Sequence, residues 1–215
     1  YTNTYDKIEN IRLKYEEALS NKGVAGIIIG TRPDCVPDEL LDYLQELDRQ
    51  TFVMVEYGIE STSNDTLKRI NRGHTYEEAE DAVRRTAARG ILTGAHIILG
   101  LPGETHEQIL QHAARLSTLP LTAVKLHQLQ LIRGTAMGQE YQRHPEHFQL
   151  YTVDEYIDLV IELIGLLRND IHIDRFISQS PKELLIAPDW GLKNPEFRTK
   201  LERRLANLPT SLKSP

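Results

Sequence analysis

The stretch Thr93-Gly-Ala-His-Ile-Ile-Leu-Gly-Leu-Pro-Gly-Glu-Thr105 joins an apolar segment to a loop rich in glycine and proline. The alternation of a β-strand places His96, Ile98 and Gly100 on one face of this segment. Gly100 and Gly103 have no Cβ atom, so a ligand or a neighbouring backbone can approach the loop closely. The pattern predicts a strand that leads through a tight turn into a helix, which is where α/β proteins bind ligands. It also fits an ordinary strand-to-helix connection in which the glycines serve only the turn.

The same alternation of strand and helix signals extends to both sides of that stretch. Apolar β-branched runs predict strands, and segments with one apolar stripe at helical spacing predict the helices between them. This order favours right-handed βαβ units and a parallel sheet. The predicted strands cover Val24–Gly30, Phe52–Glu60, Leu92–Gly100, Ala123–Leu131 and Ile171–Ile177. The first is so uniformly apolar that we expect it to be buried on both faces.

Three capping boxes predict where helices begin. In this motif a threonine side chain accepts a hydrogen bond from the backbone three residues later, and the Glu or Gln at that position reaches back. The pairs are Thr75 with Glu78, Thr105 with Gln108, and Thr152 with Glu155. In the helix after Thr105, we place His106 and His112 near the surface. Apolar residues at helical spacing also predict a helix over residues 5–20.

We divide the chain into a core over residues 1–137 and an extension over residues 138–215 that completes one side of the core. The core contains the four clearest strand signals, and the extension adds helices and the last predicted strand. The first part of the extension, Gly138–Leu150, is polar and predicts a surface loop or a broken helix. The histidines there, His144 and His147, are too few to predict a metal site.

The composition predicts a soluble cytoplasmic protein. The 215 residues are 40% hydrophobic and 26% charged, which is ordinary for a globular domain. No apolar run is long enough to cross a bilayer, so we expect no membrane partner. The net charge of −6 gives no general attraction to nucleic acid. Cys35 is the only cysteine, which excludes an internal disulfide and a metal site built from several thiolates of this sequence.

Charged residues inside otherwise apolar strands are the candidates for a site. Glu56 and Glu60 lie on one face of a predicted strand, and buried carboxylates need partners. We favour a functional role for Glu60, at the strand end, over one for Glu56. Lys125 and His127 repeat the pattern with the opposite charge, although either could instead be the partner of a glutamate across the sheet. His96 gains weight only through these neighbours.

Four motifs follow one another at the spacing of strand-helix repeats: Ile29-Gly-Thr-Arg-Pro-Asp34, Glu56-Tyr-Gly-Ile-Glu-Ser61, Leu67-Lys-Arg-Ile-Asn-Arg-Gly-His74 and Leu99-Gly-Leu-Pro-Gly-Glu104. Together they resemble the radical S-adenosylmethionine (radical SAM) superfamily. The similarity is to a bacterial branch usually labelled Fe-S oxidoreductase, near the elongator acetyltransferase catalytic subunit and oxygen-independent coproporphyrinogen oxidase. It extends to about Trp190, since Ile186-Ala-Pro-Asp-Trp190 also resembles that branch.

The resemblance implies an α/β fold, a partial (β/α) barrel of the radical SAM type. The strands from Val24 to Leu131 would be strands three to six, followed by the C-terminal extension, and strands one and two would be missing. The intact parent would reductively cleave SAM with a 4Fe-4S cluster and take a hydrogen atom from an unknown substrate. The family binds that cluster through Cys-x-x-x-Cys-x-x-Cys, which nothing in this sequence matches. We therefore expect this chain to bind no cluster and to be an inactive fragment by itself.

The resemblance also implies contacts to SAM from the ends of successive strands and from the first residues of the chain. The implied contacts are Asn3, Thr4, Tyr5, Glu60, Ser61, His96, Ile98, Gly100 and Pro102. Glu60 and Ser61 would face the ribose and the methionine end of SAM. Residues 98–102 would lie along the adenine, and residues 3–5 would sit where the family binds the methionyl amino group.

The substrate would approach at the mouth of the barrel, according to the same resemblance. Thr31, Arg32 and Asp34 would line that mouth. Lys125 and His127 would point into the substrate cavity as catalytic residues, and we expect them to set substrate specificity. The resemblance leaves open whether the substrate is a small molecule or a macromolecule.

Two other interpretations remain at this point. A cluster-free (β/α) barrel hydrolase or lyase would use Glu60, Lys125 and His127 for acid-base chemistry without iron. The other is a non-enzymatic module that binds RNA or protein, and RNA binding would need a basic face, which the composition does not indicate. With strands one and two missing, the strand over residues 24–29 becomes a sheet edge with unpaired backbone groups. We therefore expect the chain to self-associate along that edge or to have it covered.

Overall fold

The computed structural model describes residues 2–207 and contains a parallel sheet of five strands. These are β1 (Gly26–Thr31), β2 (Phe52–Glu60), β3 (Leu92–Leu99), β4 (Ala123–Gln128) and β6 (His172–Arg175). Their order across the sheet is β1-β2-β3-β4-β6, and each neighbouring pair is parallel. These five strands thus lie side by side in the order in which they occur in the chain. The predicted α/β fold with a parallel sheet is confirmed.

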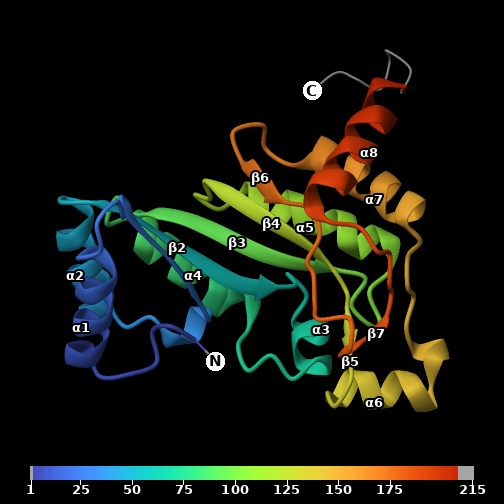
Figure 1. Ribbon diagram of the computed structural model, residues 1–215, viewed down its shortest axis with the longest axis horizontal. Coiled ribbons are helices and arrows are strands. Elements are labelled where there is room, and N and C mark those ends of the chain that lie inside the picture. Colours follow the sequence, from blue (N-terminus) through green and yellow to red (C-terminus); the bar gives the residue numbers. More distant parts are fainter. Residues whose placement is uncertain (1, 208–215) are drawn as a thin grey trace.

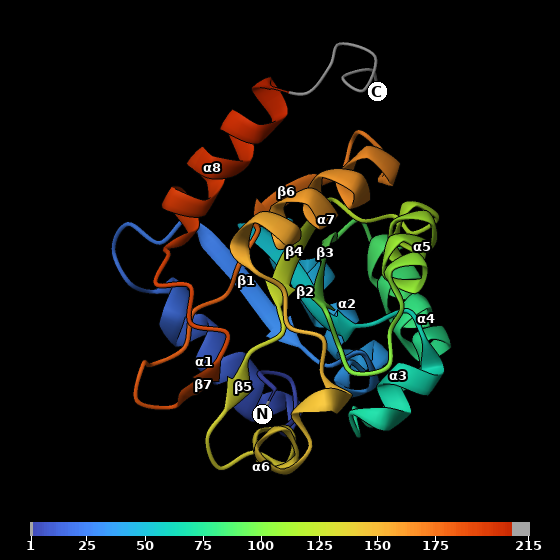
Figure 2. The same ribbon diagram turned by 90° about the vertical axis from the view of Figure 1, so that its right-hand side faces the viewer.

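Helices connect the strands and cover one face of the sheet (Figure 1). Those on that face are α1 (Ile8–Leu19), α2 (Asp38–Asp48), α4 (Tyr76–Ala87), α5 (His106–Ser117) and α7 (Val153–Leu166). The short α3 (Asn64–Arg69) precedes α4, and α8 (Asn194–Ala206) packs against α7. Figure 2 shows α4, α5 and α7 arranged around one side of the sheet. No described helix is both long and apolar enough to cross a membrane.

The hydrophobic core lies between these helices and the strand side chains that point toward them. Val53, Val55 and Tyr57 alternate along β2 and are 0% exposed, as is Leu44 of α2. Burying a Val or Leu side chain stabilises a protein by about 1.5–3 kcal/mol, so this layer holds the helices on the sheet. The opposite face of the sheet, which we name the inner face, carries the intervening residues of each strand.

All three predicted capping boxes are present, at the N-termini of α4, α5 and α7. Each satisfies two of the backbone N–H groups near a helix start that have no partner within the helix. Such a cap contributes about 1 kcal/mol. The helix predicted from residue 5 begins at Ile8 instead. Residues 3 and 4 form hydrogen bonds to the end of β1, which sets this later start.

The strand predicted over Ala123–Leu131 consists of two strands. β4 ends at Gln128, and β5 (Leu131–Ile132) pairs antiparallel with β7 (Leu185–Ala187) in a separate two-stranded sheet. The apolar alternation continues through both strands, so it cannot show where the chain changes partner. Figure 1 shows this pair beyond the end of the sheet toward which β2 points.

The broken helix predicted over Gly138–Leu150 is α6 (Ala136–Arg143) followed by the 3-10 turn η2 (Pro145–His147). Thr135 caps α6 by accepting a hydrogen bond from the Gly138 N–H. Pro145 lies in the first turn of η2, where its missing N–H costs no hydrogen bond. The proline thus separates the two helical segments.

β1 forms one edge of the sheet, and no strand within residues 2–207 pairs with its outer side. The prediction that this strand is buried on both faces is wrong. Ile29 faces the helices and is 2% exposed, whereas Ile28 on the inner face is 55% exposed. A sequence that is apolar on both faces cannot show whether another part of the chain covers each face. Asn3 Nδ2 donates to the Gly30 carbonyl oxygen at 3.1 Å, which covers part of the edge.

Candidate functional site

A group of polar side chains lies on the inner face. We name it the inner-face cluster, and it consists of Glu56 of β2, His96 of β3, and Lys125 and His127 of β4. Lys125 Nζ lies 2.5 Å from Oε1 and 2.6 Å from Oε2 of Glu56. His96 Nε2 lies 3.0 Å from Glu56 Oε2. The Glu56 carboxylate is therefore held by partners from two other strands.

A glycine in the strand between them lets Glu56 and Lys125 meet. Gly94 of β3 is the residue in register with Glu56 of β2. A Cβ atom at Gly94 would lie 3.1 Å from Glu56 Cγ and 2.9 Å from Met54 Cε. Without that atom, Lys125 reaches across β3 to a carboxylate two strands away. Gly94 was not among the predicted site residues, although a glycine inside a strand pattern indicates a close approach.

Glu56 is ionised at neutral pH. Its side chain is 6% exposed, and burial by itself would raise the pKa of the carboxyl group. Hydrogen bonds from His96 and Lys125 outweigh burial and lower the pKa of Glu56 to about 2. Glu56 was predicted to be a weaker site candidate than Glu60, because strand alternation does not show which carboxylate faces a lysine two strands away.

His127 of β4 is the fourth member of the inner-face cluster. Its ring stacks on His96, with ring centroids 5.3 Å apart and planes 24° apart. Its Nε2 is buried and has no hydrogen-bond partner within residues 2–207. Burial, followed by the electrostatic effects of His96 and Arg175, lowers the pKa of His127 to about 4. The imidazole is neutral at pH 7 and can donate one hydrogen bond and accept another.

Glu60 lies at the carboxyl end of β2, where the pairing with β3 is irregular. Its φ is 68°, a left-handed conformation that is unfavourable for a residue with a Cβ atom. Glu60 Oε1 lies 3.1 Å from Arg72 Nη2. A Cβ atom at Gly58 would lie 2.6 Å from that oxygen and 2.4 Å from that nitrogen, so both groups fold over the glycine. Burial raises the pKa of Glu60, and the positive charge of Arg72 opposes this effect.

A second polar group lies beneath the loops that follow β2 and β3. We name it the loop network, and it consists of Ser61, Thr62, Glu104 and His112, which are at most 7% exposed. Ser61 Oγ donates to Glu104 Oε1 at 2.5 Å, and His112 Nε2 lies 3.3 Å from the same oxygen. Thr62 Oγ1 lies 2.8 Å from His112 Nδ1. The network therefore connects both loops to α5.

His112 is buried, and its predicted position near the surface is wrong. α5 buries Ile109, His112 and Leu116, which follow one another at helical spacing. That spacing is visible in the sequence, and it could have placed His112 on the apolar face of the helix. His106 lies at the surface as predicted, with its Nε2 2.9 Å from Glu162 Oε2.

The glycine loop after β3 packs against a distant part of the chain. Gly100 has a φ of 89°, and a Cβ atom there would lie 3.1 Å from the ring of Tyr151. Gly100 thus makes room for a neighbouring segment. Pro102 is buried, whereas Ile98 on the inner face is half-buried. A cavity of about 430 Å³ is lined by this loop, by residues 146–149 and by Tyr151.

The N-terminal residues that the resemblance assigned to SAM lie beside β1. Asn3 contacts the backbone of this strand, and Thr4 Oγ1 lies 2.5 Å from Thr31 Oγ1. Tyr5 is 82% exposed. At the same end of the strand, Arg32 Nε donates to Asp34 Oδ1 at 2.9 Å. Asn3 and Thr4 therefore have partners on the edge strand, whereas Arg32 pairs with Asp34 just after it.

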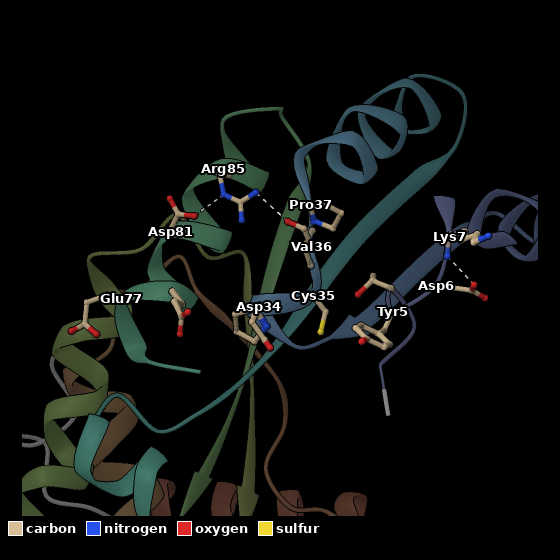
Figure 3. Close-up of a pocket in the computed structure, with 13 residues that line it drawn as sticks. Tyr5, Asp6, Lys7, Asp34, Cys35, Val36, Pro37, Glu77, Asp81 and Arg85 are labelled. Carbon is tan, nitrogen blue, oxygen red and sulfur yellow. Dashed lines mark hydrogen bonds and ion pairs between the residues drawn. The ribbon is translucent and has the colours of Figure 1, made fainter. Parts of the chain in front are cut away.

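A cavity of about 1040 Å³ opens next to these residues (Figure 3). Its walls also include the turn η1 (Pro33–Cys35) and, from α4, Glu77, Asp81 and Arg85. The Cys35 sulfur points into the space (Figure 3), and burial raises the pKa of this thiol. No residue of the inner-face cluster lines this cavity. The two sites are therefore separate.

Two observations bear on metal binding. His144, Glu146 and His147 place ligand atoms within 4.8 Å of one another, and all three residues are exposed. They could hold a divalent ion at the surface. Cys35 is the only cysteine of the sequence. Because a 4Fe-4S cluster needs several thiolate ligands, the residues of this chain do not fit that cluster.

The structure brings together part of the predicted site. His96, Lys125 and His127 meet in the inner-face cluster, and Glu60 lies at the carboxyl end of the neighbouring strand β2. The predicted contacts at residues 3–5 lie beside β1, at the edge of the sheet. The inner-face cluster thus combines three of the predicted site residues with the buried Glu56 carboxylate on the inner face.

Comparison with known proteins identifies one family for both parts of the chain. The Radical SAM superfamily model matches residues 1–116, and the Radical_SAM C-terminal domain model matches residues 121–207. YtqA of Bacillus subtilis is 33% identical over 207 residues, which cover 96% of this chain and 64% of YtqA. MJ0486 of Methanocaldococcus jannaschii is 32% identical over 206 residues, which cover 95% of this chain and 63% of MJ0486. The chain therefore spans less than two-thirds of the length of these relatives.

A solved structure shows the same fold. Elp3 of Methanocaldococcus infernus, with an N-terminal deletion, matches with a TM-score of 0.73 and 20% sequence identity. The match covers 85% of this chain and 42% of the Elp3 chain. The likeness supports the arrangement of the parallel sheet and its helices.

Proposed function

The chain belongs to the radical SAM superfamily, and from this premise we propose that it carries the SAM-binding and substrate-binding face of an Fe-S oxidoreductase. The parent protein would take a hydrogen atom from its substrate. The inner-face cluster carries this proposal, because Glu56, His96 and Lys125 join three parallel strands on the open face of the sheet. Ligands of α/β proteins bind near the carboxyl ends of such strands.

The residues at the ends of β2 and β3 fit a nucleoside cofactor. SAM presents ribose hydroxyls, an adenine ring and an amino acid end. Glu60 supplies a carboxylate that accepts hydrogen bonds from hydroxyl or ammonium groups. Ile98 is half-buried on the inner face and supplies an apolar surface for the ring. The Ser61 hydroxyl is bonded to Glu104, so we assign Ser61 to holding the loop.

Bound SAM supplies the hydrogen-abstracting chemistry of this superfamily, together with a 4Fe-4S cluster. Cys35 alone does not fit that cluster. In our proposal the cluster ligands belong to a part of the parent protein outside these 215 residues, and this chain by itself is inactive.

Lys125 and His127 are the catalytic residues of the proposal. The Lys125 ammonium has three N–H donors, and the Glu56 carboxylate occupies two, which leaves one for a substrate. His127 offers a neutral imidazole. Because the charges of Glu56 and Lys125 cancel, we expect the inner-face cluster to bind an uncharged polar part of the substrate.

The cofactor part of the proposal is tested by titrating this chain with SAM in a calorimeter. We expect E60Q to weaken binding roughly tenfold, the effect of losing one hydrogen bond to a charged group. E107Q, which changes an exposed glutamate in the first turn of α5, is the matched control and should bind like the original chain. An equal loss in both variants would contradict the assignment of Glu60.

The reaction is tested on a parent protein that includes the cluster cysteines. After anaerobic reconstitution with iron and sulfide, we expect the protein to form 5′-deoxyadenosine from SAM under reducing conditions. The H127N variant should bind SAM normally but lose substrate turnover. A parent that assembles its cluster and forms no 5′-deoxyadenosine would overturn the proposed reaction.

The other sequence-based interpretations have less support. The family assignment does not favour a cluster-free hydrolase or lyase, or a module that binds RNA or protein. We place the function in the cytoplasm, whose reducing conditions keep a free thiol such as Cys35 reduced.

We also propose that the outer edge of β1 pairs with another strand, from a second copy or from the rest of the parent. The unpaired backbone groups of an edge strand favour such pairing. Light scattering on this chain should then show a dimer, and a strictly monomeric chain at high concentration would rule out pairing between copies.

A further inference from the structure

Glu60 adopts a backbone conformation that its own side chain disfavours. Its φ of 68° lies in the left-handed region, which residues other than glycine rarely adopt. Such a conformation persists only where the surrounding structure imposes it. The next two residues along the chain, Ser61 and Thr62, are members of the buried loop network. The two residues that can hold the Glu60 backbone in place are thus the two that follow it in the chain.

The loop network fixes these two residues from several directions. Ser61 Oγ donates to Glu104 at 2.5 Å and accepts a hydrogen bond from the Ser63 N–H at 3.0 Å. Thr62 Oγ1 bonds to His112, and the Thr62 carbonyl oxygen accepts a hydrogen bond from Arg115. Both the side chain and the backbone after Glu60 are therefore held.

The polar side chains of the loop network are unfavourable to bury. Glu104 and His112 are buried polar groups, and Glu104 Oε2 has no hydrogen-bond partner within residues 2–207. Apolar side chains of similar size often stabilise a core as well or better. Hydrogen bonds, however, are directional, so a polar network selects one backbone arrangement where apolar packing tolerates several.

We propose that Glu104 and His112 are positioning residues that keep Glu60 in its left-handed conformation by holding Ser61 and Thr62. This conformation turns the Glu60 carboxylate back over Gly58, onto the inner face and beside Arg72. The importance of that placement for SAM rests on the proposed function. The mechanical claim, that the network imposes the strained backbone, is independent of any cofactor.

A comparison of glycine and alanine at position 60 measures the strain. E60G and E60A both remove the carboxylate, but only glycine adopts positive φ without cost. In the otherwise unchanged chain, we expect the Tm of E60G to exceed that of E60A by roughly 2–4 °C or more. Equal Tm values for the two variants would overturn the claim that residue 60 is held under strain.

The same pair is then compared with the network anchors removed. The S61A/T62V background removes both hydroxyls with little change in volume. If the network imposes the strain, residue 60 relaxes in this background and the Tm difference between glycine and alanine falls well below its value in the otherwise unchanged chain, with the Arg115 bond to the Thr62 carbonyl oxygen as the remaining anchor. A difference that stays unchanged would overturn the proposal. Should S61A/T62V fail to fold, S61A alone keeps the Thr62 anchor and should reduce the difference partially.

A matched control separates this effect from general destabilisation. V83A removes methyl groups from a fully buried residue of α4 that is not a member of the network. The difference between glycine and alanine at position 60 should keep its full size in the V83A background. If it shrinks there as much as in S61A/T62V, the coupling is not specific to the network and the proposal fails.

Titration with SAM adds the functional readout. S61A/T62V keeps the Glu60 carboxylate but loosens the backbone that positions it, so we expect SAM affinity to fall, by at most the roughly tenfold loss of E60Q. Unchanged affinity in S61A/T62V would separate the network from cofactor binding. If the unchanged chain binds no SAM, the cofactor assignment fails, whereas the Tm comparison still decides whether the network positions Glu60.

Discussion

The inner-face cluster and the loop network each bury a glutamate, but they hold it differently. Glu56 lies 2.5 Å from the Lys125 ammonium, so a full opposite charge balances it. Glu104 accepts a hydrogen bond from Ser61 at 2.5 Å, lies 3.3 Å from His112, and has one oxygen without a partner within residues 2–207. The cluster joins strands and the network joins loops. The register of the strands is already fixed by their backbone pairing, so the side chains of the inner-face cluster are free to bind a ligand. The loops have no such pairing, and they need directional hydrogen bonds to adopt one conformation.

Replacing Lys125, the ammonium partner of Glu56, should lower the free energy of unfolding more than any other single substitution proposed for the two regions. K125M leaves the buried Glu56 carboxyl group without its ammonium partner, with His96 as its remaining partner. Breaking a buried ion pair by removing one partner costs about 3–5 kcal/mol, so the free energy of unfolding in urea should fall by about 3 kcal/mol. The double variant E56Q/K125M removes both charges and should recover most of that loss. A double variant no more stable than K125M would show that charge balance does not hold the cluster.

Lowering the pH should lower the free energy of unfolding, and the group responsible is His127 of the inner-face cluster. Its pKa in the folded protein is about 4, below the usual 6.5. The unfolded chain therefore binds the proton more tightly, so this contribution to stability is complete above pH 6.5 and is lost as the pH falls toward 4. At 1.36 kcal/mol per pKa unit, the loss reaches about 3 kcal/mol. Urea unfolding at pH 7 and pH 4 measures it.

The matched variants for this pH dependence are H127N and H106N. H127N should lack most of the loss between pH 6.5 and pH 4, because the titrating group is gone. H106N changes an exposed histidine of α5 and should keep the full dependence. If the stability of H127N falls between pH 6.5 and pH 4 as much as that of the unchanged chain, a group other than His127 causes the pH dependence.

A methyl group added at Gly94, in the strand between Glu56 and Lys125, should destabilise the inner-face cluster less than K125M does. G94A places a Cβ atom 3.1 Å from Glu56 Cγ and 2.9 Å from Met54 Cε, so both side chains must move. We expect a loss of about 1–2 kcal/mol in the free energy of unfolding. G165A is the control, because a Cβ atom there meets nothing within 4 Å and alanine favours the helix. Equal effects of the two changes would argue against Gly94 as the opening for Lys125.

Neutralising the glutamate of the loop network should have the smallest effect. In E104Q the amide oxygen still accepts the hydrogen bond from Ser61. We expect a loss of about 1 kcal/mol, well below that of K125M, in the same urea experiment. A loss as large as that of K125M would show that Glu104 and His112 act as a full ion pair and would remove the contrast between the two regions.

Much of the architecture was predictable from local patterns. The capping boxes, the parallel strands and the shared face of Lys125 and His127 all follow from spacing along the chain. The family followed from four short motifs, and the comparisons confirmed it. These features need only neighbouring residues or fixed periods, which the sequence states directly.

The partners inside the site were less predictable. Alternation placed Glu56 on the correct face, but its pairing with Lys125 depends on strand order, on register and on the missing Cβ of Gly94. The burial of His112 depends on which helix face meets the core. The left-handed backbone of Glu60 has no local signal at all, because its sequence reads as the end of a regular strand.

The sequence by itself determined the kinds of element, their order and the family, since each of these depends on propensities and motifs that act over a few residues. Only the tertiary structure decided which charges meet, which histidine is buried and where the backbone is strained. The reason is physical: these properties arise between atoms that lie 40 to 69 positions apart in the chain, as in His96 with Glu56 and Lys125 with Glu56, and a distance in space is set by packing and register.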